Sequence, residues 1–445
     1  MDKTKYIVAV EIGSSKISGA LGRVRSSSPD RLEVLAIETE RATEIVRHGL
    51  IQNVEEVGSR VSSIVARLER RLNISGRSAK ISSVYVGLSG RSLRNILIEV
   101  KRNLPDDTEI TDRIISDLRD DAVHYNIDSS LEVVQAEPRS YIVNRNETRN
   151  PVGICGNSIT ARYNLIACRP LLNKHLHRVI TAKAGFEIAD RVVVPVALAN
   201  LVLSAEEKRL GCMLVDFGAE TTTVGIYKDN TLTYLAVLPM GSRNITTDIT
   251  SLSVLEDRAE EIKTTSGSAI QSENEPTLNL SGVKLSDVAN LVAARSEEIV
   301  TNIVEQIRYA GLTDKQLPGG IVMAGGGFEL KRFPELLEEC SGLKVRSSVL
   351  PANVTIEDPK ASAYESLQLV SIMAAGMAQD KPDSVVIEEL PEIETNGEYV
   401  PESPTEVQPP HEPKVVRGQN VMAKIKRGFI TIFGPSSDDE DTDFN

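Results

Sequence analysis

The chain has no tryptophan, 4% aromatic residues and only four cysteines among its 445 residues. The cysteines (Cys155, Cys168, Cys212 and Cys340) lie far apart, and none belongs to a CxxC pair. A disulfide framework or a zinc site is therefore not expected, and a reducing compartment is the expected environment.

Positive charge and long apolar runs are also scarce. The net charge of −13 argues against broad binding to nucleic acid, because neutralising phosphates needs a basic surface. The longest apolar run, roughly 192–203, is too short to span a bilayer and contains Pro195. The N-terminus enters a predicted strand at once, so we expect neither a signal peptide nor a transmembrane helix.

A chain of this length exceeds what one hydrophobic core usually organises, so we expect at least two domains. Strand-like and helix-like segments alternate from about residue 6 to 185, which predicts an α/β fold. The stretch 84–167 differs, because one amphipathic helix at 112–125, capped by Thr111, is flanked by alternating strands. This pattern predicts a compact inserted α+β domain.

The strongest chemical signal is a pair of matching strand–turn–strand segments, VAVEIGSSKI at 8–17 and MLVDFGAETT at 213–222. Aligning Glu11 with Asp216 also aligns Gly13 with Gly218. The glycines let backbone N–H groups approach phosphate oxygens, and the two carboxylates can hold Mg²⁺ through its waters. Charge and hydrogen bonds are expected from the other polar residues of the turns, namely Ser14, Ser15, Lys16, Thr221 and Thr222.

A third element is the predicted buried strand 321–324, which runs into Gly325, Gly326, Gly327 and Phe328. Glycines at such a strand end let a flat ring or a phosphate lie against the backbone. One acid-x-Gly turn is also typical of ordinary hairpins, but two in equivalent settings favour an ATP site between two related lobes. The sequence lacks GxxxxGK[ST] and a well-placed GxGxxG, so a P-loop and a dinucleotide fold are not expected.

These segments resemble the phosphate-1, phosphate-2 and adenosine motifs of the actin, Hsp70 and sugar-kinase superfamily. Within it, LPMGSRNITTDI at 238–249, AEEIKT at 259–264 and VGLSGR at 86–91 are similar to the FtsA family of bacterial cell-division proteins. The resemblance covers about residues 6–379. The resemblance also places Gly241, Glu260 and Lys263 at the nucleotide site, the last two near the adenosine. The i, i+3 spacing of Glu260 and Lys263 puts them on one helix face.

The resemblance implies a two-lobed, actin-like (RNase H-like) fold. We expect a first lobe (1A) at 1–83, 168–200 and 350–379, with an inserted 1C domain at 84–167 that contributes to self-association. The second lobe (2A) is expected at 201–245 and 310–349, with subdomain 2B at 246–309. The family binds the tail of the tubulin-like protein FtsZ with subdomain 2B, where Arg295 and Glu298 match that surface.

Two departures from the superfamily pattern concern hydrolysis. Glu11 stands where many relatives have Asp, and Ala219 stands where a second glycine is common. No catalytic residue is assigned, because none is identified to position an attacking water. We therefore expect binding of Mg-ATP with at most slow hydrolysis.

The C-terminal region predicts a tether and a membrane anchor. Residues 380–418 are rich in Pro, Glu and Asp, which predicts a disordered acidic linker. At 419–434 an amphipathic helix is expected to lie on an anionic membrane, with an acidic tail at 435–445. Its membrane residues are expected to be Val421, Met422, Lys424, Ile425, Lys426, Arg427, Phe429, Ile432 and Phe433.

The interpretation that follows is a peripheral protein on the cytoplasmic face of the membrane at the division site. It would self-associate, tether FtsZ filaments and help other divisome proteins assemble the septal ring. A PilM-like actin-fold adaptor of pilus assembly is the alternative, although it would not need the anchor. A small-molecule kinase of the same superfamily would need a catalytic base beside a substrate pocket, and no convincing candidate is found.

Overall fold

The computed structural model describes residues 4–72, 77–271, 279–280, 283–359, 362 and 364–389. Residues up to 390 form one compact unit. The predicted anchor at 419–434, the acidic tail and the linker beyond 389 lie outside the described residues.

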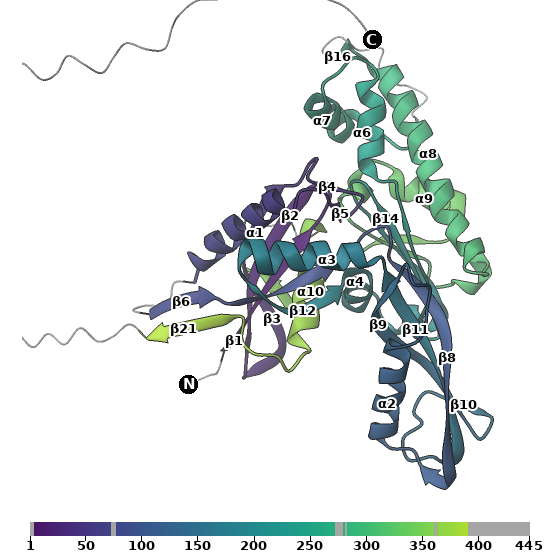
Figure 1. Ribbon diagram of the computed structural model, residues 1–445. Helices are drawn as coiled ribbons and strands as arrows, with labels where there is room; N and C mark the ends of the chain where they lie inside the picture. The colour runs from purple at the N-terminus through teal and green to yellow at the C-terminus, as the bar shows by residue number, and fades with distance from the viewer. Residues whose placement is uncertain are drawn as a thin grey trace, which may run out of the picture. The chain divides into compact units, whose positions relative to one another are not determined.

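The first lobe is built on a six-stranded sheet in the order β12-β7-β1-β2-β3-β20 (Figure 1). β1 pairs antiparallel with β2 and parallel with β7. The strands of this sheet are β1 (Thr4–Ile12), β2 (Lys16–Arg25), β3 (Ser28–Arg41), β7 (Ser83–Leu88), β12 (Glu187–Val193) and β20 (Val354–Ile356).

Alternation along β1 explains how this sheet is covered on both faces. Val8 and Val10 pack with buried residues of α1 (Val54–Glu69), whereas Ile7 and Ala9 pack with α10 (Leu367–Met377). Successive side chains of a strand point to opposite faces, so an uninterrupted apolar run is needed here. Each fully buried aliphatic side chain contributes roughly 1.5–3 kcal/mol.

The second lobe has a five-stranded sheet in the order β15-β14-β13-β18-β19. The first lobe repeats this arrangement as β3-β2-β1-β7-β12, so the sequence repeat at the two turns extends to whole sheets. One face is covered by α6 (Ser242–Thr250), α8 (Leu285–Tyr309) and α9 (Phe333–Ser341). The strands are β13 (Cys212–Phe217), β14 (Thr222–Lys228), β15 (Thr231–Leu238), β18 (Ile321–Ala324) and β19 (Val345–Ser347).

The inserted domain is a four-stranded sheet, ordered β10-β9-β11-β8, with α2 against it (Figure 1). Its elements are β8 (Arg94–Glu109), α2 (Asp112–Val123), β9 (Glu132–Val143), β10 (Asn146–Thr148) and β11 (Cys155–Cys168). Asn95 joins this domain to the second lobe by accepting a hydrogen bond from the Leu235 N–H at 2.8 Å.

Four details correct the sequence-based expectations. Ser83–Leu88 is a strand of the first-lobe sheet, so the insertion begins after it and not at residue 84. Thr111 makes no side-chain capping bond to α2. The helix expected at 112–125 ends at Val123, with His124 as its C-cap. Val385–Glu389 forms β21, paired with β6 (Arg77–Ile81), so the expected linker does not begin at 380.

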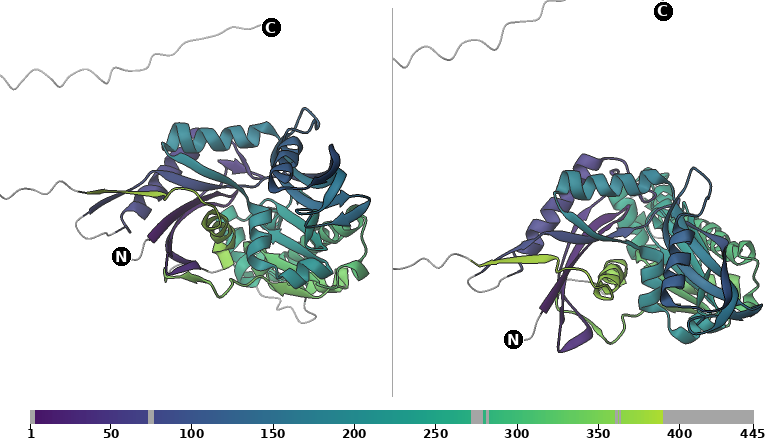
Figure 2. Two further views of the ribbon diagram at one scale, coloured as in Figure 1. Left: turned by 90° about the horizontal axis from the view of Figure 1, so that it is seen from below. Right: turned by 60° about the horizontal axis from the view of Figure 1, so that its bottom comes forward.

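The remaining elements connect these layers (Figure 2). After β11 the chain forms α3 (Pro170–His177), continues as a π-helix (Arg178–Ala184) and stops at Gly185, whose φ is 81°. Also present are β4 (Val46–Arg47), β5 (Leu50–Ile51), α4 (Val194–Val202), α5 (Ala205–Leu210), α7 (Glu256–Ser266), β16 (Asn279–Leu280), β17 (Val283–Lys284) and the 3-10 helices Asp314–Gln316, Gly326–Glu329 and Tyr364–Ser366.

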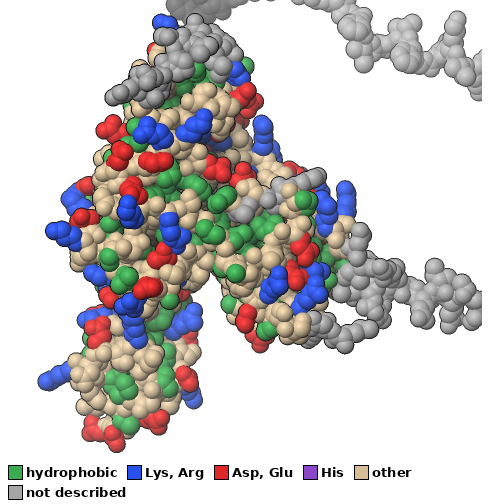
Figure 3. Space-filling model, turned by 180° about the vertical axis from the view of Figure 1, so that it is seen from behind, with side chains coloured by type: hydrophobic (Ala, Val, Ile, Leu, Met, Phe, Trp, Pro, Cys, Tyr) green, Lys and Arg blue, Asp and Glu red, His purple; other side chains and the backbone are tan. Residues whose placement is uncertain are grey.

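The surface mixes charges of both signs. On the face drawn in Figure 3, Lys and Arg side chains are interspersed with Asp and Glu side chains, and apolar side chains lie between them. Within the described residues, no helix is both long enough and apolar enough to cross a bilayer.

Candidate functional site

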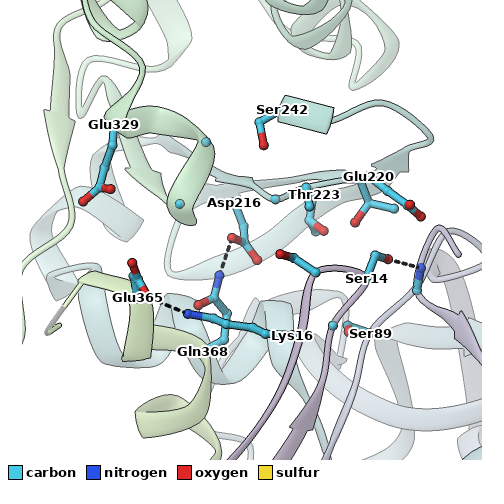
Figure 4. Close-up of a pocket in the computed structure, with 18 of the residues that line it drawn as sticks. Ser14, Lys16, Ser89, Asp216, Glu220, Thr223, Ser242, Glu329, Glu365 and Gln368 are labelled. Carbon is cyan, nitrogen blue, oxygen red and sulfur yellow. Dashed lines mark hydrogen bonds and ion pairs between the residues drawn. The ribbon is translucent and has the colours of Figure 1, made fainter. Parts of the chain in front are cut away.

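A cavity of about 490 Å³ lies between the two lobes, and the two matching turns form opposite parts of its wall. In Figure 4, Ser14 and Lys16 belong to the first turn, and Asp216 and Glu220 to the second. Of the residues expected to hold nucleotide or metal, those that line the cavity are Glu11, Gly13, Ser14, Ser15, Lys16, Asp216, Gly218, Thr221, Glu260, Lys263, Gly326 and Gly327.

The two turns have the same backbone geometry. The Gly13 N–H donates to the Lys16 carbonyl at 2.9 Å, and the Gly218 N–H donates to the Thr221 carbonyl at 2.9 Å. A Cβ at Gly13 would lie 3.1 Å from the Lys16 oxygen, and one at Gly218 would lie 3.0 Å from the Thr221 oxygen. Both glycines are therefore required by a close backbone approach, and the sequence alignment of the turns reflects a shared structure.

The carboxylates of the turns face the same cavity. Burial raises the pKa of Glu11 to about 7, with Lys16 opposing the shift and Asp216 adding to it. Burial also raises the pKa of Asp216 to about 6, although a hydrogen bond from Gln368 opposes this shift. Two buried acids facing one cavity, one of which disfavours the charge of the other, form an environment suited to a cation.

The donor set fits Mg²⁺ bound with most of its waters. No group of three or more His, Cys, Asp or Glu side chains within the described ranges could hold a metal ion by itself. Mg²⁺ commonly binds through one or two carboxylates together with water and substrate phosphates. Glu11 and Asp216 offer that number of carboxylates, with hydroxyl groups beside them.

Helices α6 and α7 form the wall beside the second turn. The N–H groups of Ser242 and Arg243 donate to the carbonyls of Gly218 and Ala219 at 2.9 and 2.8 Å, which fixes the start of α6 to the turn. Lys263 is buried, and its ammonium donates to Glu260 at 2.7 Å and to Thr246 at 3.0 Å. Burial lowers the pKa of Lys263, and Glu260 opposes that shift.

The glycines after β18 bring backbone close to the second turn. Gly325 has φ of 86°, and a Cβ there would lie 2.4 Å from the Phe217 carbonyl oxygen. A Cβ on Gly326 would meet nothing within 4 Å, so this residue presents open backbone to the cavity. Gly325 itself shapes the strand end and does not line the cavity.

Three further expected ligands also lie outside the cavity wall. Thr222 is buried, and its hydroxyl donates to the Met240 carbonyl at 2.8 Å. Gly241 lies at the start of α6, where a Cβ would fall 2.4 Å from the Ala219 oxygen. Phe328 packs against Tyr364, with ring centroids 5.9 Å apart. These residues support the cavity wall and do not face the cavity.

Sequence reasoning missed several residues that line the cavity. Gln368 of α10 donates to the Asp216 carboxylate at 2.7 Å across the lobes, and Glu365 pairs with Lys16 at 2.9 Å (Figure 4). Glu329 lies on the opposite side of the cavity from Glu220. The other missed residues are Ile12, Gly49, Ser89, Val194, Ala219, Thr223, Ser242, Ile245, Thr264 and Leu330. No local motif marks Gln368 or Glu365, because only the fold brings α10 to the turns.

Arg295 and Glu298 lie on α8, away from the cavity. The Arg295 guanidinium holds Asp248 of α6 in a bidentate pair at 2.6 and 2.9 Å, and it also contacts Glu298 at 2.5 Å. The hydrogen bond from Arg295 to Asp248 raises the arginine's pKa. The ion pairs of this surface are therefore already formed in the isolated chain.

Comparisons with known proteins agree with this architecture. A family model described as "Cell division protein FtsA" matches residues 213–374, and one described as "SHS2 domain inserted in FTSA" matches residues 90–167. The chain is 27% identical over 368 residues to a cell division protein FtsA of Porphyromonas gingivalis, covering 80% of this chain and 74% of that protein. It is 26% identical over 421 residues to one of Pseudomonas aeruginosa, covering 87% and 96%.

Among solved structures, the chain is similar to one from a "PilM-PilN type IV pilus biogenesis complex". The TM-score is 0.56 at 16% identity, covering 84% of this chain and 98% of that one. At this identity the likeness shows the fold alone and does not favour a pilus role.

The second family model begins beyond β7, in agreement with the corrected start of the insertion. The two models, the two-lobed actin-like fold and the relatives that match across most of the chain lead to one conclusion. The chain belongs to the FtsA family of cell-division proteins.

Proposed function

We propose that the cleft binds ATP with Mg²⁺ between the two turns, and that the bound nucleotide serves assembly of a division scaffold. The observation that carries this proposal is the pair of equivalent glycine turns, each with a carboxylate, facing one cavity of about 490 Å³. A cavity of this size lies within the range of small-molecule sites.

The turns would hold the phosphates, and α7 with the glycines after β18 would hold the adenosine. Backbone N–H groups and the hydroxyls of Ser14 and Ser15 would bind phosphate oxygens, with Lys16 adding charge. Glu11 and Asp216 would hold Mg²⁺, which would neutralise phosphate charge. Glu260 and Gly326 would lie beside the nucleoside.

The ion pairs of the cavity acids favour binding of ATP over its rapid hydrolysis. Three of the acids that line the cavity, Glu220, Glu260 and Glu365, are ion-paired, with Arg243, Lys263 and Lys16 respectively. A carboxylate held in an ion pair is a poor proton acceptor for an attacking water. Val194, at the start of α4, adds an apolar side chain to the wall.

The nucleotide site can be tested by the fluorescence of an ATP analogue titrated with and without Mg²⁺. We expect Lys16→Ala to weaken binding about tenfold, the loss of one charge-assisted contact. Arg162→Gln, which breaks a surface pair with Glu99 in the inserted domain, serves as the matched control. An unmodified chain that binds no nucleotide in either condition would refute the proposal.

The proposal extends to partners and location. The family membership supports self-association and a role with other divisome proteins at the septum. The sequence of 419–434 supports reversible attachment to an anionic membrane, with polymerisation multiplying weak individual contacts. We therefore propose that the chain acts peripherally at the cytoplasmic face of the membrane.

Membrane attachment is tested by sedimenting the chain with anionic vesicles, with and without Mg-ATP, beside a truncation ending at Gly418. We expect the full chain to pellet with vesicles, more so with Mg-ATP, and the truncation to stay in the supernatant. Equal behaviour of both proteins would contradict the anchor.

The proposed filament partner is the acidic tail of FtsZ, bound at Arg295 and Glu298. Because Asp248 already holds the Arg295 guanidinium at 2.6 Å, an incoming carboxylate would compete with a formed pair. Arg295→Ala should therefore weaken tail binding. Asp248→Asn should strengthen it, because the arginine loses its bidentate partner and keeps its ion pair with Glu298. Opposite results for the two variants would exclude this surface.

A further inference from the structure

The tip of the β4–β5 hairpin touches both turns of the cleft through neighbouring backbone amides. The Gly49 N–H donates to the Ser14 hydroxyl oxygen of the first turn at 3.0 Å. The adjacent His48 N–H donates to the Glu220 carboxylate of the second turn at 2.7 Å. The hairpin belongs to the first lobe, so these bonds join the two lobes at the phosphate end of the cavity.

Glu220 is held firmly for this contact. Glu220 is only 6% exposed, and the Arg243 guanidinium donates to its carboxylate at 2.7 Å. The same guanidinium donates to the Thr43 hydroxyl of the first lobe at 3.3 Å. A buried carboxylate needs such partners, because removing one leaves a desolvated charge.

The hairpin tip has positive φ at both of its central residues, as a two-residue type I′ turn requires. His48 has φ of 48° and Gly49 has φ of 71°, both in the left-handed region. A Cβ at Gly49 would lie 2.6 Å from the Gly90 Cα, so the tip is pressed against the chain that follows β7. The tight turn between β4 and β5 therefore sets this conformation, and the close approach of Gly90 leaves no room for a side chain at position 49.

We propose that Glu220 and Arg243 form a latch between the lobes, and that closing it positions Ser14 for a nucleotide phosphate. This inference rests on the proposed nucleotide site. Since the Ser14 oxygen accepts from Gly49, its O–H is left to donate into the cavity. Glu220 and Arg243 act through the hairpin tip and are positioning residues.

Other contacts between the lobes are weaker candidates for this role. Arg41 and Asp257 meet at 3.7 Å with side chains 85% and 95% exposed, so solvent screens the pair. The Gln368–Asp216 bond engages a proposed metal carboxylate and would respond to the metal. Among the contacts of the described residues, the latch alone links Ser14 with the second turn through a charge-assisted bond to a buried acid.

The latch makes release of phosphorylated nucleotides depend on Glu220. Bound phosphates touch both turns and favour the closed state, so the latch must open before exchange. We expect Glu220→Gln to speed release of a fluorescent ATP analogue about tenfold, as one charge-assisted bond is weakened. Affinity for adenosine, which does not reach the turns, should stay unchanged.

A double variant and amide exchange separate a latch from general loosening. Combining Glu220→Gln with Arg243→Lys should speed release no more than the stronger single change, because both act on one contact. In the nucleotide-free protein, Glu220→Gln should also speed hydrogen exchange of the His48 amide. Glu99→Gln, which breaks a surface pair within the inserted domain, is the matched control and should change none of these.

Each outcome decides the inference separately from the proposed function. If the unmodified chain binds ATP and Glu220→Gln releases it at the unmodified rate, the latch is wrong and the site stands. If no nucleotide binds, the site is wrong, and unchanged exchange at His48 would remove the latch as well. Should Glu220→Gln not fold, Thr43→Val loses only the 3.3 Å bond and should speed ATP release about twofold.

Discussion

The two turns share a backbone but differ in what supports them. The first turn ends in Lys16, whose charge is paired within its own lobe by Glu365 at 2.9 Å. The second turn has the neutral Thr221 at that position, and it is braced by the first N–H groups of α6. Two turns of the same backbone conformation can therefore differ in role. The first turn supplies charge, and the second is fixed to the rest of its lobe.

The largest expected effect comes from breaking the brace that only the second turn has. Gly241→Ala would place a Cβ 2.4 Å from the Ala219 oxygen and 2.6 Å from the Gly218 oxygen. Both contacts are with backbone, so α6 must move away from the turn. We expect a loss of about 2–4 kcal/mol in the free energy of unfolding, together with loss of nucleotide binding.

Urea denaturation and nucleotide titration measure the two effects of Gly241→Ala. Gly326→Ala is the control for stability, because its Cβ would meet nothing within 4 Å. An alanine at 241 that leaves both quantities unchanged would mean that the turn does not need α6.

The next effect compares the two carboxylates. Since burial raises both pKa values, ionising these acids destabilises the folded protein when no metal is bound. This loss in the free energy of unfolding is absent below the pKa of the acid in the unfolded chain. It grows as the pH rises toward the pKa in the folded protein. For Glu11 this window runs from 4.5 to about 7, and for Asp216 from 3.8 to about 6.

Glu11→Gln should therefore raise the free energy of unfolding of the metal-free protein at pH 8, by at most about 3 kcal/mol. Asp216→Asn should give a smaller gain, and both gains should shrink at pH 5. Thermal melts in EDTA measure this, and nucleotide titration should show weaker Mg²⁺-dependent binding. A loss of stability at pH 8 for both variants would contradict the assigned environment.

The smallest effect tests a position where the turns already differ. Thr222 pairs with Phe217 across its hairpin, as Ile17 pairs with Ile12 in the first turn. Thr222→Val thus makes the second turn resemble the first and removes the bond to the Met240 carbonyl. We expect a loss of about 1 kcal/mol in stability and unchanged nucleotide affinity, because the side chain points away from the cavity.

Chemical denaturation and nucleotide titration of Thr222→Val provide the measurement. A strong loss of affinity without loss of stability would return Thr222 to the list of direct ligands. The matched change Ile17→Thr in the first turn should cost more, because it buries a hydroxyl in an apolar core.

Much of the fold and part of the site could be predicted from local patterns. The turn glycines and the two carboxylates were found because one short segment recurs in the sequence. The structure places Thr222 and Phe328 outside the cavity wall, which the sequence could not show because it identifies a turn but not which way each side chain points. The start of the insertion was misplaced because β7 is as apolar as a domain-opening strand.

The sequence by itself determined that this protein has two related lobes, a pair of matching glycine turns and an inserted domain. These features are written in segments of a few residues, where glycine, charge and periodicity act locally. Only the tertiary structure decided that Gln368 reaches Asp216 and that the hairpin tip at His48 reaches Glu220. Those partners are 152 and 172 residues apart, so nothing but the packing of the two lobes brings them into contact.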